Sequence, residues 1–117
     1  MDNSKLIFLS VLIYSVALAG CGNNKEMSQR NKELLWIEKG KDAVRLKLKD
    51  ADSAEFRNVY FKRGSDGVPV ACGEVNSKNS FGGYSGYQQF ISAGKPELTY
   101  LQEQASDFDT VWRRFCG

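Results

Sequence analysis

A β-hairpin is predicted by the segment Arg57-Asn-Val-Tyr-Phe-Lys-Arg-Gly-Ser-Asp-Gly-Val-Pro-Val-Ala-Cys-Gly-Glu-Val75. Residues 57–63 form the first strand, and its alternation puts Val59 and Phe61 on one face and Tyr60 on the other. The turn follows at Ser65-Asp-Gly67, because Asp-Gly tolerates the positive φ of tight hairpins. Residues 68–75 are the return strand, with Pro69 near its start, where a missing N–H matters least.

The chain after this hairpin predicts a glycine-rich loop and two further strands. Residues 76–86 are the loop, and residues 87–92 and 98–102 are the strands, placed around the turn residues Gly94-Lys-Pro96. We therefore expect a small antiparallel sheet of three to four strands.

A helix is predicted before the hairpin, over residues 29–50. Its apolar residues recur at alternating spacings of three and four, with Lys41 as the polar exception: Leu34, Ile37, Val44 and Leu48. Gly40 weakens the middle of this helix by roughly 1 kcal/mol and is a candidate break. Because Val44, Leu46 and Leu48 also alternate, a strand is the competing interpretation of its end.

Polar residues mark the end of this helix. Asp50-Ala-Asp-Ser53 is expected to terminate it, since Asp and Ser favour caps and turns. A single turn over residues 53–56 would then place Phe56 in the core.

A second helix is predicted to start at Ser106, whose side chain can cap the first turn. Asp107 and Asp109 suit the positive end of the helix. One apolar face is formed by Phe108, Val111, Trp112 and Phe115. The order helix, strands, helix predicts an α+β fold, with residues 29–117 as a single domain in which helices cover the sheet.

The first twenty residues have the pattern of an export signal. Lys5 supplies the one cation, and residues 6–19 are almost wholly apolar. As a helix, residues 6–19 would span roughly 21 Å, short of a ~30 Å hydrocarbon core. The pattern therefore favours a cleaved signal peptide over residues 1–20 rather than a lasting transmembrane helix.

The segment Leu18-Ala-Gly-Cys21 resembles the lipobox of bacterial lipoproteins, in which small residues precede an obligatory Cys. The resemblance covers residues 1–21. It implies cleavage before Cys21, diacylglycerol on its sulfur and acylation of the new amine. Two or more acyl chains give stable anchoring in a lipid bilayer, at about 0.8 kcal/mol per buried methylene. The alternative is an ordinary secretory signal cut near Ala19, with Cys21 free or disulfide-bonded.

The residues after Cys21 predict a tether and a location. Residues 21–28 are the predicted lipidated tether, because residues 22–28 are polar and turn-rich, and these seven residues reach at most about 25 Å. Gly22 stands where Gram-negative lipoproteins kept in the inner membrane carry Asp. In a Gram-negative host this implies the outer membrane of the cell envelope, with the domain facing the periplasm.

Three cysteines in an exported chain leave one unpaired unless it has another role. If Cys21 carries lipid, Cys72 and Cys116 remain for a disulfide in an oxidising compartment. Such a bond would close a loop over residues 72–116 and contribute roughly 4 kcal/mol. Two buried thiols or an intermolecular bond are the alternatives.

Composition argues against catalysis and against a metal or nucleic-acid partner. The chain has no His, so it lacks the commonest general base and the commonest zinc ligand. The carboxylate pairs Asp50/Asp52 and Asp107/Asp109 fit helix ends better than acid–base chemistry. A net charge of +2 is too small to indicate nucleic acid. The basic positions within residues 39–49 fit a solvated helix face, with lipid headgroups as the alternative contact.

The glycine-rich loop is the candidate binding site. It gathers polar donors and aromatic side chains that can anchor a partner: Lys78, Asn79, Phe81, Tyr84 and Tyr87. The alternative is that the glycines permit a tight turn and the aromatic rings fold back to cover the sheet. Phosphate binding of the P-loop type is disfavoured, because the Lys-Ser/Thr pair and the following helix are missing.

Two blocks of this sequence resemble a small family of uncharacterised bacterial and prophage-associated proteins. The first is Leu48-Lys-Asp-Ala-Asp-Ser-Ala-Glu-Phe-Arg-Asn-Val59, and the second joins Cys72-Gly-Glu-Val-Asn76 to Lys78-Asn-Ser-Phe-Gly-Gly-Tyr-Ser-Gly-Tyr87 and Phe90-Ile91. Many members carry Pro where this chain has Ala51, a departure that affects only a turn. The resemblance covers about residues 44–91 and implies a recurring module, but no activity and no catalytic residue.

These observations together predict a membrane-tethered, non-enzymatic binding module without a cofactor, apart from the covalent lipid on Cys21. Its partners would be the bilayer and an envelope protein, and a prophage setting would fit host envelope modification or exclusion of related phages. One alternative is a periplasmic inhibitor of a hydrolase such as lysozyme, although the known lysozyme-inhibitor lipoproteins are mostly strand. Another is a structural lipoprotein without a specific ligand.

Overall fold

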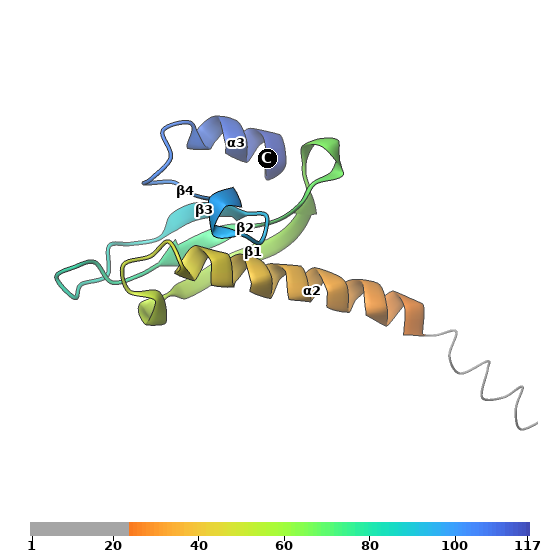
Figure 1. Cartoon of the computed structure of the whole chain (residues 1–117), viewed down its shortest axis with the longest axis horizontal. Coiled ribbons are helices and arrows are strands. Elements are labelled where there is room, and N and C mark those ends of the chain that lie inside the picture. Colours follow the sequence, from red (N-terminus) through yellow and green to blue (C-terminus); the bar gives the residue numbers. More distant parts are fainter. Residues whose placement is uncertain (1–23) are drawn as a thin grey trace, which may run out of the picture. The chain divides into compact units, whose positions relative to one another are not determined.

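A four-stranded antiparallel sheet is the centre of the computed structural model, which describes residues 24–117 (Figure 1). Residues 33–117 form one compact unit, which contains the whole sheet. The strands are neighbours in the order of the sequence: β1 (Glu55–Arg63), β2 (Pro69–Asn76), β3 (Gln88–Ser92) and β4 (Thr99–Leu101). The predicted α+β class and strand count are confirmed.

The hairpin turn between β1 and β2 forms where the Asp-Gly pair predicted it. Asp66 and Gly67 both adopt positive φ, at 60° and 74°. The Gly64 N–H donates to the Val68 carbonyl at 2.8 Å and closes the hairpin. Pro69 opens β2 opposite Arg63, so the missing N–H falls at the strand's end, as expected.

A β-bulge interrupts β1, which the sequence pattern did not predict. The register with β2 shifts between Arg57 and Tyr60, and Asn58 adopts a positive φ of 53°. The extra residue lets Phe56 and Val59, three positions apart, pack against the same core cluster. Phe56 therefore lies within β1, edge-to-face against Phe90 at 5.6 Å between ring centroids. The single turn predicted over residues 53–56 is wrong, because a 3-10 turn at Ala51–Ser53 precedes the strand.

Helix α2 (Asn24–Arg45) begins earlier and ends earlier than predicted. Residues 24–28, expected to be turn-rich, are helical. At the other end, Lys47 and Leu48 donate backbone N–H groups to carbonyls three residues back, which tightens the chain into turns before β1. Leu48 thereby packs against the core. The strand alternative for this segment is wrong.

Gly40 lies at the closest contact between α2 and the sheet. Helix α2 runs through it without a break, so the predicted interruption is wrong. A Cβ on Gly40 would come within 2.7 Å of the Ala71 Cβ on β2. Glycine is needed here because the helix backbone approaches the strand closely. Leu34, predicted to lie on the buried stripe, is instead 53% exposed.

Helix α3 (Phe108–Phe115) covers the opposite face of the sheet (Figure 1). Its N-cap is Asp107 rather than the predicted Ser106, and no side chain caps it. The predicted apolar face is confirmed, since Phe108 is buried and Val111, Trp112 and Phe115 pack against the same cluster.

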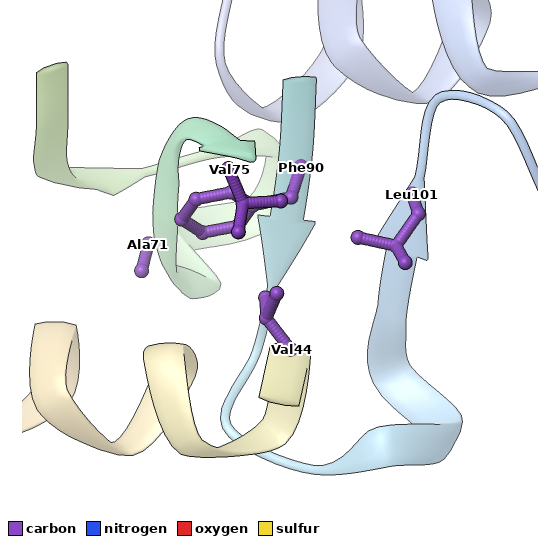
Figure 2. Close-up of a cluster of buried hydrophobic side chains, with 5 residues drawn as sticks. All are labelled: Val44, Ala71, Val75, Phe90 and Leu101. Atoms are coloured by element: carbon purple, nitrogen blue, oxygen red, sulfur yellow. The ribbon is translucent and has the colours of Figure 1, made fainter. Parts of the chain in front are cut away.

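Two hydrophobic clusters therefore lie on the two faces of one sheet. The cluster under α2 consists of Val44, Ala71, Val75, Phe90 and Leu101 (Figure 2). The cluster under α3 contains both ends of a disulfide: Val70, Cys72, Ile91, Phe108 and Cys116. Alternate residues of β2 point to opposite faces, so this strand supplies both cores.

Candidate functional site

The loop between β2 and β3 is a hydrogen-bonded extension of the sheet. Lys78 and Tyr84 form an isolated antiparallel bridge. At the tip, the Asn79 N–H donates to the Gly83 carbonyl at 2.8 Å, and the Asn79 Oδ1 accepts the N–H groups of Phe81 and Gly83. Gly82 adopts a φ of +80°, which explains the need for glycine. Asn79 therefore holds the turn together.

The base of this extension is attached to the turn that follows α2. The Lys78 N–H donates to the Ser53 Oγ at 2.8 Å, and the Lys49 ammonium donates to the Ser80 Oγ at 3.1 Å. The turn after α2 and the loop between β2 and β3, two segments distant in sequence, are thus joined, which fixes the position of the loop's hairpin tip, residues 77–87.

Phe81 projects from the tip and is 97% exposed. The backbone on both sides of it is held by the hydrogen bonds of Asn79. A large apolar ring is therefore exposed to solvent on a hydrogen-bonded backbone. Less backbone entropy is then lost when a partner binds.

The two tyrosines of the loop contact their own chain. The Arg57 guanidinium lies 3.6 Å from the Tyr87 ring centroid, and the Lys78 ammonium lies 5.7 Å from that of Tyr84. A hydrogen bond with Glu55 raises the pKa of the Tyr84 hydroxyl. Tyr87 thus lies against Arg57, and Tyr84 contacts Lys78 although its side chain is 46% exposed, so Phe81 is the most exposed aromatic residue of the loop.

A polar cluster beside Tyr87 was missed by the sequence reasoning. The Arg57 guanidinium donates to the Glu74 Oε2 at 2.9 Å, and the Asn58 Nδ2 donates to its Oε1 at 3.0 Å. Both bonds lower the pKa of the Glu74 carboxyl group, and the bond from Arg57 has the larger effect. The tolerance of Asn for positive φ was the one available signal that β1 bends here.

The predicted disulfide between Cys72 and Cys116 is present, with its Cα atoms 6.0 Å apart. Both cysteines are buried. The bond joins the middle of β2 to the end of α3, so its role in this fold is structural.

Other sequence expectations concern metals and the membrane. Within residues 24–117, no three acidic, Cys or His side chains gather as metal ligands. No helix in this part of the chain is long and apolar enough to cross a bilayer. Cys21 and the predicted signal peptide lie outside the described residues. Comparison with protein-family models, curated proteins and solved structures gives no significant match.

Proposed function

We propose that this chain is a bacterial envelope lipoprotein, anchored through acylated Cys21, whose folded part is a non-enzymatic binding module. The contact surface is the hairpin tip, residues 77–87, and Phe81 is its anchor residue. The observation that carries the proposal is the almost complete exposure of an aromatic side chain on a hydrogen-bonded tip.

The energetic case rests on the size and order of that side chain. Full burial of an exposed Phe side chain is favourable by roughly 1.5–3 kcal/mol before association costs. A tip that is already ordered loses little backbone entropy on binding. Phe81 belongs to neither core cluster, so packing of the folded chain does not explain its placement.

The anchor is supported by the order of features in the sequence. The apolar run, the small residues and Cys21 follow one another as export and lipidation require. Asn24, the first described residue, already belongs to helix α2 and lies three residues after the proposed lipid attachment. Acylation would keep the folded part at the membrane surface and raise its effective concentration toward envelope partners.

Site-specific photocrosslinking in the native cell tests the proposed contact. A photoreactive phenylalanine analogue at position 81 should form one discrete adduct with an envelope protein. The same analogue at Leu35, an apolar side chain that is also exposed, should not. Absence of an adduct at position 81, or the same adduct from both positions, would count against the tip as the contact surface.

Inhibition of a hydrolase such as lysozyme is a second candidate, favoured by the same observation, because a rigid tip can insert into an active-site cleft. The mature protein would then inhibit lysozyme at stoichiometric concentration, and Phe81→Ser would abolish the effect. Equal inhibition by both proteins would exclude insertion of Phe81.

A further inference from the structure

A polar hollow of about 170 Å³ lies beside the base of the hairpin tip. Its walls come from the turn after α2, both sides of the hairpin base, the start of β3 and the chain at and after the end of β4. Three lysines and several amides and hydroxyls dominate its lining, which contains one carboxylate, that of Glu103.

Asn79 and Gln88, two of the three amide side chains of this hollow, accept backbone hydrogen bonds with their oxygens, whereas Gln104 donates from its Nε2 to the Lys47 carbonyl at 3.1 Å. The Asn79 Oδ1 accepts two backbone N–H groups of the tip. The Gln88 Oε1 accepts the backbone N–H of Glu103 at 3.0 Å. What remains on both side chains is the NH₂ group, which can only donate. The hollow therefore offers the NH₂ donors of Asn79 and Gln88, beside one amide acceptor, the Oε1 of Gln104.

The charged side chains that line the hollow are mostly positive. Lys47 is held by the Thr99 carbonyl at 2.6 Å and Lys49 by the Ser80 Oγ at 3.1 Å, so each ammonium keeps further donors. Among residues 24–117, neither these two lysines nor Lys78 forms an ion pair, whereas Lys41 on α2 pairs with Glu38. Three cations against the single carboxylate of Glu103 leave an excess of positive charge.

We propose that this hollow binds a phosphate-type oxyanion. Its volume exceeds the ~30 Å³ share of one water molecule several times, enough for a phosphate group. The ammonium and amide donors match the several acceptor oxygens of such a group. Because Lys78 and Asn79 belong to residues 77–87, this inference deepens the proposed function by naming the ligand chemistry at the base of the tip.

Titration of the full-length mature lipoprotein in non-ionic detergent tests the site, with inorganic phosphate as the probe and ¹H–¹⁵N spectra as the readout. Signals of Asn79, Gln88 and the hollow's backbone should shift on titration. The pair Lys49→Gln and Lys78→Gln should weaken binding roughly tenfold. The matched pair Lys39→Gln and Lys95→Gln, outside the hollow, should change it less than about twofold.

Glu103→Gln should change the affinity for phosphate in the opposite direction. Removing the carboxylate should strengthen binding by roughly fivefold, whereas Glu97→Gln, outside the hollow, should leave binding unchanged. A merely structural role of these residues would not produce a gain. Dispersed spectra of every variant establish that it is folded.

A second arm identifies the source of the phosphate. Adding phosphatidylglycerol to the micelles, compared with the same amount of phosphatidylcholine, should shift the same signals if a lipid headgroup is the ligand. Shifts with inorganic phosphate but not with phosphatidylglycerol support a soluble or saccharide-borne phosphate. No shift in the hollow with either probe overturns the inference. The result is independent of the adduct at position 81, so the two proposals can fail separately.

Discussion

The two faces of the sheet hold their helices by different means. On the α2 face, contact is non-covalent: Gly40 brings the helix backbone against Ala71, and Val44 is fully buried. On the α3 face, the eight-residue helix is bonded to β2 through Cys72–Cys116. The longer helix is held by non-covalent contacts, which include those of Lys41 and Arg45 with the Phe56 ring, whereas the shorter one has a covalent link.

The difference follows from helix length. Isolated helices shorter than about 12–15 residues are marginal in water, and α3 has eight residues without a side-chain N-cap bond. The disulfide removes much of the entropy that its segment would gain on detaching. A small domain can therefore cover both faces of its sheet although one helix is too short to form alone.

Removing the disulfide should give the largest effect. The double variant Cys72→Ala, Cys116→Ala should lose about 4 kcal/mol of unfolding free energy in urea titrations. Amide exchange should become fast in α3 while α2 residues 33–45 stay protected. Equal loss of protection in both helices would show that the two faces do not differ in this way.

Truncating Val44 should have the next largest effect. Val44→Ala leaves a void in the cluster under α2 and should cost about 2 kcal/mol. Val111→Ala, its counterpart on the half-buried face of α3, should cost about half as much. Urea denaturation measures both losses of unfolding free energy. A larger loss for Val111→Ala than for Val44→Ala would contradict the expectation that the α2 face depends more on this kind of packing.

Adding one methyl group tests the close approach of α2. Gly40→Ala gains about 1 kcal/mol of helix propensity but forces a Cβ to within 2.7 Å of Ala71, so we expect a net loss of about 1 kcal/mol. Gly83→Ala, where nothing lies within 4 Å of the added Cβ, is the control and should change stability little. A stabilised Gly40→Ala protein would contradict the packing.

The smallest effect concerns pH and the partly buried Glu74, whose side chain is 28% exposed. Its pKa is lowered in the folded state, chiefly by Arg57 and then by Asn58. The stabilisation is therefore present above the ordinary pKa of a glutamate and is lost as pH falls through the lowered folded-state value. Glu74→Gln should be slightly less stable than the parent near neutrality and should converge with it in acid. If the stability difference between the two proteins persists in acid, its cause is not the ionisation of Glu74.

The sequence predicted what local patterns and covalent chemistry determine. Alternation and the Asp-Gly pair predicted the hairpin, and cysteine counting predicted the bond between Cys72 and Cys116. It failed at Gly40, where local propensity suggests a break and only the distant Ala71 explains the glycine. The bulge at Asn58 likewise depends on pairing with β2, which alternation within one strand cannot reveal.

At the candidate site, too, the sequence did not predict contacts between segments that are distant in the chain. Glycines and aromatics identified the loop, but the sequence could not separate Phe81 from Tyr84 and Tyr87. That separation depends on Glu55 and Arg57, which β1 brings beside the loop. The hollow at the base of the tip also joins segments too far apart in sequence to be recognised as one site.

The proposed function rests on the attachment of this domain to lipid through Cys21. The intact mass of the protein extracted from membranes of its native cell tests this most directly. We expect the mass of residues 21–117 plus diacylglycerol and an amide-linked acyl chain, with the modification mapped to the first residue. A chain that still carries Met1, or an unmodified thiol at position 21, would contradict the account.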